Sequence, residues 1–111
     1  MSRHLNRVAR RLAIVVSTSS PSDFAAAFSL ARAAIDVDID VGVFFMDAAV
    51  GELSGHASIV EDLTERGCEL IACAGSAHAL GVSETHAGML LGSQDDHAAL
   101  VHRAERTVAF T

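Results

Sequence analysis

The chain contains two cysteines, Cys68 and Cys73, at the two ends of the apolar segment CELIAC. If this segment is a β-strand, its rise of about 3.3 Å per residue separates the two Cα atoms by roughly 16 Å. A disulfide needs Cα atoms within about 7 Å of each other, so we expect two free thiols, as is usual in a reducing cytosol. A thiolate is a strong nucleophile, and the first question is therefore which of the two sulfurs is available for chemistry.

The small residues after Cys73 favour this second thiol as the reactive one. The sequence AGSAHALG predicts a short helix that starts at Ala74 and ends at Gly81. Unpaired backbone N–H groups at the start of this helix would point at the Cys73 sulfur, and Gly75 and Ser76 are small enough to leave the sulfur open. These N–H groups would lower the pKa of the thiol from its ordinary value of about 8.5.

Two ionisable residues are candidates for tuning this thiol. His78 lies one turn further along the predicted helix and adds positive charge when it is protonated. Asp47 follows the second predicted strand and is suited to orient a histidine or accept a hydrogen bond near Cys73. Each of the three residues also has a plainer interpretation, because a buried cysteine packs as a small hydrophobe, a helix histidine is often solvated, and an aspartate after a strand is often a cap. The sequence leaves these alternatives open.

The elements that position these residues follow from the hydrophobic pattern. Apolar β-branched runs alternate with segments of helical periodicity, which predicts a mostly parallel sheet covered by helices on both faces, a three-layer α/β/α sandwich. Ligands and reactive groups gather at the carboxyl ends of such strands, where Cys73 lies and Cys68 does not. The predicted strands are 12–17, 40–46, 68–73 and 106–110, with a short strand at 89–91. The predicted helices are 21–36, 55–66, 74–80 and 94–104. In the helix over 55–66, Ile59 and Leu63 are expected to face inward.

The segment STSSPSD, residues 17–23, follows the first predicted strand at the same edge. The hydroxyls of Ser17, Ser19 and Ser20, with the N-terminal amides of the next helix, suit an anion. The alternative role is capping of that helix by Ser20 ahead of Pro21. The segment weakly resembles a flavodoxin phosphate loop, but the threonine-rich glycine turn and the aromatic residues that sandwich flavin are missing. A flavin or nucleotide binder is therefore the third hypothesis, and no cofactor is expected.

The composition of the chain excludes several classes of function. The net charge is −6, and four of the eight basic residues fall within residues 1–11, which predicts a flexible basic arm followed by one acidic domain over 12–111. An acidic domain without Trp or Tyr does not suit direct nucleic-acid binding. The chain has no lysine, which excludes Schiff-base and Walker-type chemistry, and no apolar run of membrane-spanning length. His78 and His86, on either side of Glu84, match no strong zinc signature, so no metal is expected.

The segment IACAGSAHALGV, residues 71–82, resembles the DsrE/DsrF-like family, in which a strand ends in Cys and is followed by small residues and then Gly with an aliphatic residue. LAIVVSTSSPSD resembles the family's first strand and Ser/Pro loop, AAFSLARAAIDVDIDVGVFFMDAAV its first helix and second strand, and RAERTVAF its closing strand. The resemblance spans about residues 12–110. It implies a three-layer α/β/α fold of the DsrEFH type, related to flavodoxin-like topology, and assembly into trimers or hexamers.

The resemblance also implies that Cys73 carries sulfane sulfur as a persulfide. Members that relay sulfur often have Arg before the Gly, whereas this chain has Ala79 and Leu80. We therefore expect a small cytoplasmic sulfur carrier or persulfide sulfurtransferase, which takes sulfur from a donor protein and relays it to an acceptor protein. The alternative is a non-catalytic oligomeric module of the same fold that binds a ligand or partner at the three loops.

Overall fold

A five-stranded parallel sheet forms the centre of the molecule, in the strand order β4-β3-β2-β1-β5. The computed structural model describes residues 10–82 and 89–111. All five predicted strands are present, and each observed end lies within one residue of the predicted end. The strands are β1 (Arg11–Val16), β2 (Asp40–Phe45), β3 (Glu69–Cys73), β4 (Leu90–Gly92) and β5 (Arg106–Phe110).

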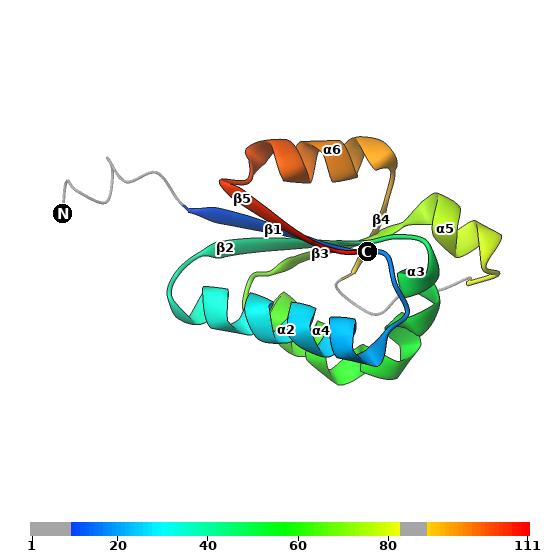
Figure 1. Ribbon diagram of the computed structural model, residues 1–111, viewed down its shortest axis with the longest axis horizontal. Helices are drawn as coiled ribbons and strands as arrows, with labels where there is room; N and C mark the ends of the chain where they lie inside the picture. Colours follow the sequence, from blue (N-terminus) through cyan, green and yellow to red (C-terminus); the bar gives the residue numbers. More distant parts are fainter. Residues whose placement is uncertain (1–9, 83–88) are drawn as a thin grey trace.

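Helices cover both faces of the sheet, so the predicted three-layer α/β/α fold is confirmed (Figure 1). Helices α2 (Pro21–Asp36) and α4 (Ala57–Glu65) lie on one face, and α6 (Gln94–Arg103) lies on the other. Parallel strands are joined by right-handed crossovers, and the chain moves across the sheet in one direction from β1 to β4. The connection from β4 to β5 runs back in the opposite direction, and the same handedness therefore places α6 on the opposite face.

Each side of the sheet has its own packed core, because successive strand residues point to opposite faces. The core beneath α2 and α4 contains Phe24, Phe45 and Cys68. The smaller core beneath α6 contains Phe44 and Cys73, together with Ala13, Ile71 and Leu100. Cys68, just before β3, and Cys73, its last residue, therefore lie on opposite faces of the sheet as well as at opposite ends of the strand.

Helix starts follow the predicted capping residues. Ser20 caps α2, and its hydroxyl accepts from the Asp23 N–H at 3.4 Å. Ser93 caps α6 in a capping box, because its side chain accepts from the first turn while the Asp96 carboxylate accepts from the Ser93 N–H at 2.7 Å. The predicted boundaries at residues 21 and 94 are confirmed by these contacts.

The helix predicted over 55–66 needs correction. A short helix α3 (Ala48–Glu52) and a 3₁₀ turn η1 (Leu53–His56) precede α4, which is only nine residues long. Val60 rather than Ile59 is fully buried beside Leu63, and Ile59 is only partly buried. Gly51 and Gly55 disfavour a continuous α-helix here, which explains the break.

Residues 1–9, most of the predicted basic arm, lie outside the described residues, and Arg11 is the first residue of β1. Among the helices formed by residues 10–82 and 89–111, none combines the length and the apolar character needed to cross a membrane.

Candidate functional site

Cys73 is the last residue of β3 and the N-cap of the short helix α5 (Ala74–Ala79). Its side chain is 7% exposed, yet it borders an open hollow of about 510 Å³ at the carboxyl ends of the strands. The hollow is lined by Asp47, Ala48, Cys73, Gly75, Ser76, Ala79 and Leu80. The thiol is therefore packed against the α6-side core and still reaches solvent through this hollow.

Hydrogen-bond donors converge on the Cys73 sulfur. Burial by itself raises the pKa of a thiol, but the hydroxyl and N–H of Ser76, the side-chain amide of Gln94 and the N–H of Gly75 together lower the pKa of Cys73 below its ordinary value. The Gln94 Nε2 atom lies 3.7 Å from Sγ. These donors favour the thiolate, which is the reactive form of cysteine.

Asp47 takes part through its backbone. Its N–H donates to the Ser76 Oγ atom at 2.9 Å, which leaves the Ser76 hydroxyl proton free to face the Cys73 sulfur. Asp47 has φ 53° and ψ −136°, a conformation that costs energy for any residue except glycine. Asp47 thus contributes an N–H group to the hydrogen bonds at the hollow, whereas the prediction assigned the role to its carboxylate.

Gln94 was missed by the sequence reasoning, although it is the first residue of α6 and follows the predicted cap Ser93. Strand β4 pairs with β3 in a register that places Gly92 beside Cys73. A Cβ at Gly92 would lie 2.6 Å from Ile71 Cγ2 and 2.7 Å from Asp96 Oδ2, so only glycine permits this close approach. The Gly-Ser-Gln sequence at the start of α6 was the available signal.

The other predicted site residues lie elsewhere. His78 is exposed on α5 and does not line the hollow, and Ala74 is exposed beside Cys73. The serines of the first loop do not line it either. The Ser17 N–H donates to the Phe110 carbonyl oxygen at 3.0 Å, and Ser19 is exposed. Ser20 caps α2, the alternative role given to it.

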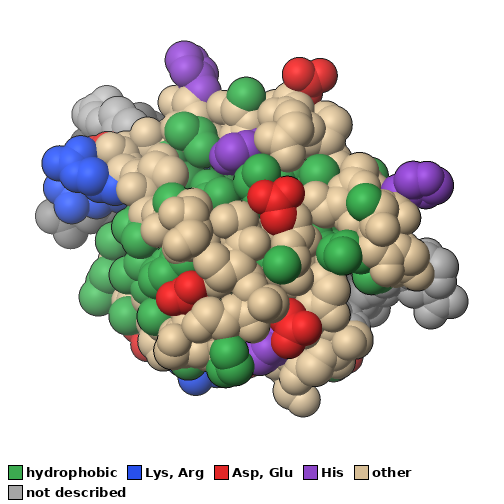
Figure 2. Space-filling view, turned by 45° about the vertical axis from the view of Figure 1, so that its right-hand side comes forward, with side chains coloured by type: hydrophobic (Ala, Val, Ile, Leu, Met, Phe, Trp, Pro, Cys, Tyr) green, Lys and Arg blue, Asp and Glu red, His purple; other side chains and the backbone are tan. Residues whose placement is uncertain are grey.

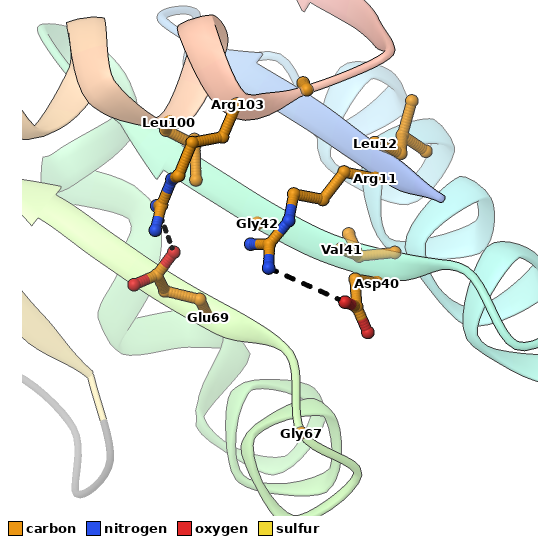
Figure 3. A pocket seen from close by; sticks show the side chains of 10 residues that line it. Arg11, Leu12, Asp40, Val41, Gly42, Gly67, Glu69, Leu100 and Arg103 are labelled. Carbon is orange, nitrogen blue, oxygen red and sulfur yellow. Dashed lines mark hydrogen bonds and ion pairs between the residues drawn. The ribbon is translucent and has the colours of Figure 1, made fainter. Parts of the chain in front are cut away.

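Cys68 has the opposite environment at the amino end of β3. It is 5% exposed within the core beneath α2 and α4, and burial together with the neighbouring Glu69 carboxylate raises its pKa to about 12. A second hollow of about 240 Å³ lies at this end of the sheet (Figure 3). Two ion pairs border it, Arg11–Asp40 at 3.8 Å and Arg103–Glu69 at 3.2 Å. Both thiols are free, as predicted.

The surface around the carboxyl ends carries acidic and histidine side chains, with basic side chains only at its margin (Figure 2). Such a surface repels a phosphate backbone. Within the described residues, no group of three or more His, Cys, Asp or Glu side chains is arranged to hold a metal ion. Glu84 and His86, considered from the sequence, lie outside those residues.

Comparisons with known proteins agree with this architecture. The profile of the DsrE/DsrF-like family matches residues 10–110. The crystal structure of the ychN protein from E. coli superposes with a TM-score of 0.79 at 16% identity and covers 93% of this chain and 100% of that one. A conserved protein of unknown function from Bacteroides thetaiotaomicron gives a TM-score of 0.78 at 14% identity over 90% and 94% of the two chains. No curated protein gave a sequence match. On the family match over nearly its whole length, the chain belongs to the DsrE/DsrF-like family.

Proposed function

We propose that this protein is a sulfur carrier, in which Cys73 accepts sulfane sulfur as a persulfide and passes it to an acceptor thiol. The family is generally linked to sulfur relay. The observation that carries the proposal is the set of donors from Ser76, Gly75 and Gln94 around the Cys73 sulfur, which lowers the pKa of this thiol. Cys68 has no such support, because its pKa is raised to about 12.

In the first step the Cys73 thiolate attacks the outer sulfur of a donor persulfide. The bond between the two donor sulfurs breaks, the donor leaves as a thiolate, and the transferred sulfur becomes bonded to Cys73 Sγ. The proton on the transferred sulfur remains with it or passes to solvent, so the exchange needs no oxidant or reductant. The N–H and O–H donors that favour the thiolate also suit the negatively charged persulfide.

In the second step an acceptor thiolate attacks the outer sulfur of the Cys73 persulfide and releases the Cys73 thiolate. The hollow gives the acceptor its path, because it opens directly beside Cys73 and is lined mainly by the small or apolar residues Ala48, Ala79 and Leu80. A cytoplasmic setting, where thiols stay reduced, suits this chemistry.

The test is intact-mass analysis after incubation with a low-molecular-weight persulfide donor. The wild type should gain the mass of one sulfur atom, reversed by dithiothreitol, and Cys73→Ser should gain none. Cys68→Ala is the matched control and should gain sulfur as the wild type does. Sulfur uptake by Cys73→Ser, or no uptake by the folded wild type, contradicts the proposal.

A non-catalytic binding module is the second candidate, and the apolar hollow with the half-exposed Leu80 favours it. It predicts that Cys73→Ser retains every cellular role of the protein. Loss of that role in a folded Cys73→Ser protein rejects this candidate. A protein that stays colourless and whose melting temperature is unchanged by FMN or nucleotides rejects the flavin alternative.

We further propose that the chain forms a homo-oligomer, a trimer or a hexamer. Leu90 and Leu91 on the edge strand β4, and Leu80 at the hollow, are each about half exposed. An edge strand with exposed apolar side chains is a ready surface for pairing with another chain. Light scattering coupled to size exclusion measures the assembly, and a monomer at micromolar concentration contradicts this proposal.

A further inference from the structure

His97 lies one turn after Gln94 on α6 and contacts it directly. The His97 Nδ1 atom is 2.9 Å from Gln94 Oε1. Its imidazole also stacks on Phe44, with ring centroids 4.9 Å apart and an angle of 14° between the planes. Phe44 is completely buried beneath α6, so the imidazole rests on a rigid surface. The contact with Gln94 is thus held by packing as well as by the hydrogen bond.

The orientation of the Gln94 amide decides whether it helps or opposes the Cys73 thiolate. With Nε2 toward Sγ, the amide donates to the sulfur, and Oε1 is left facing His97. With the amide reversed, its carbonyl oxygen would face the negative sulfur and repel it. When Cys73 is a thiolate, the Gln94 side chain satisfies both neighbours in only one orientation, and that orientation requires a proton on His97 Nδ1.

We propose that His97 is a positioning residue, which fixes the Gln94 amide so that its N–H group donates to the Cys73 sulfur. The inference builds on the proposed function, because it assumes a reactive Cys73 thiolate. His97 acts through Gln94 and does not contact the sulfur itself. The titratable side chains near this contact are Asp95 and Asp96 on α6 itself, Asp47 at the start of α3 and His78 on α5, and they are left unchanged in the test below.

The experiment compares His97→Phe with His97→Asn. Phenylalanine keeps a ring to stack on Phe44 but removes the donor, whereas asparagine loses the ring and keeps an N–H group near the Nδ1 position. The rate of Cys73 alkylation by iodoacetamide is measured from pH 5 to pH 10, with the adduct located by mass spectrometry. Circular dichroism and thermal melting check that each variant is folded.

His97→Phe should raise the pH at which Cys73 alkylation reaches half its maximum and slow the reaction at pH 7 by about threefold or more, the range expected for one lost hydrogen bond. His97→Asn should stay close to the wild type. In a Gln94→Ala background, His97→Phe should have no further effect, because the two residues act as one unit.

Equal pH profiles for the wild type and the folded His97→Phe protein overturn the inference. The inference is also overturned if His97→Phe changes the alkylation rate equally in the wild-type and the Gln94→Ala backgrounds. Alkylation needs no sulfur donor, so this test succeeds or fails independently of persulfide formation. A wild type that is alkylated with the expected His97 dependence but takes up no sulfur would reject the proposed function and leave the positioning role intact.

Discussion

The two ends of β3 carry the same side chain in opposite electrostatic settings. Cys68 at the amino end and Cys73 at the carboxyl end are 5% and 7% exposed. The pKa of Cys68 is raised to about 12 by burial and by Glu69, whereas donors from three residues lower the pKa of Cys73. The exposed fraction of the residue therefore does not separate the two thiols. Burial of the sulfur in the core and the Glu69 carboxylate oppose the thiolate of Cys68, whereas N–H and O–H groups directed at the Cys73 sulfur favour its thiolate beside the open hollow.

The surroundings of the two ends differ in the same way. The amino end is bordered by ion pairs, in which each arginine already has a carboxylate partner (Figure 3). The carboxyl end presents an open hollow and strained backbone at Asp47. Parallel sheets place helix and loop N–H groups at their carboxyl ends, and this explains why chemistry is expected there and structural pairing at the opposite end.

The largest expected effect is an alkaline loss of stability caused by Cys68. An acid whose pKa is raised in the folded state resists ionising there, so the unfolded state gains stability relative to the folded state once the pH exceeds about 9, where an unburied thiol ionises. At pH 11 this lowers the free energy of unfolding by about 2 to 3 kcal/mol, at roughly 1.4 kcal/mol per pH unit. The chain has neither tyrosine nor lysine, whose ionisation in this pH range would add to the pH dependence of the free energy of unfolding.

Urea unfolding at pH 8 to 11 measures this loss, with Cys68→Ala as the control. The control begins less stable because of the missing sulfur, but its free energy of unfolding should vary little above pH 9. Cys73 does not make the free energy of unfolding vary with pH above pH 9. Its pKa is lowered in the folded state, so the stability that it contributes is fully present once the pH exceeds the ordinary pKa of a thiol. Parallel slopes for the wild type and Cys68→Ala would contradict the comparison.

Gly42→Ala should damage the amino end without changing the thiol at the carboxyl end. A Cβ at Gly42 collides with Cδ1 of Leu100, which is buried beneath α6. We expect a loss of about 1 to 3 kcal/mol in the free energy of unfolding, typical of an overpacked core. Cys73 alkylation in the folded protein should keep its rate. A large fall in that rate would show that the two ends are coupled.

Ser76→Ala tests the carboxyl end itself. It removes the hydroxyl that links the Asp47 N–H to the Cys73 sulfur, so alkylation of Cys73 at pH 7 should slow by about tenfold, the effect of a charge-assisted hydrogen bond. Asp47→Gly is the matched variant. It keeps the N–H group and suits φ 53°, so reactivity should persist. Loss of reactivity in Asp47→Gly would instead assign a role to the carboxylate.

The smallest expected effect is at the Arg103–Glu69 pair. Both side chains are about half exposed, and such pairs contribute less than about 1 kcal/mol. Glu69→Gln should lower the free energy of unfolding only slightly and leave Cys73 alkylation unchanged. Removing this carboxylate also lowers the pKa of Cys68, although burial still keeps that thiol unreactive. Chemical denaturation of Glu69→Gln beside the wild type gives the measurement.

The sequence predicts the fold well because its signals are local. Alternating apolar runs, the caps Ser20 and Ser93, and the position of Cys73 after an apolar strand all lie within a few residues of the feature they predict. Gln94 was missed because its contact with Cys73 spans 21 residues and depends on the pairing of β4, a strand of only three residues. Gly92 and Ser93 are local signals for a close approach and a helix start, but they do not specify that β4 pairs with β3.

The roles of Asp47 and His78 show a second limit of prediction from the sequence, which is the direction in which a group points. Asp47 was placed correctly at the edge, but its backbone N–H rather than its carboxylate contacts Ser76, and backbone direction depends on a positive φ that the residue type does not encode. His78 lies on the exposed side of α5, because Ala77 is the residue of that helix that turns into the core.

Competition between the two thiols tests the central claim most directly. The folded wild type is treated with less than one equivalent of iodoacetamide at pH 7, and the adducts at Cys73 and Cys68 are counted by mass spectrometry. The pKa of Cys73 is lowered from 9.0 and that of Cys68 is about 12, so at pH 7 the thiolate fraction of Cys73 is at least about a thousandfold larger and Cys73 should be alkylated first. Equal labelling of the two thiols, or labelling of Cys68 first, would contradict the account.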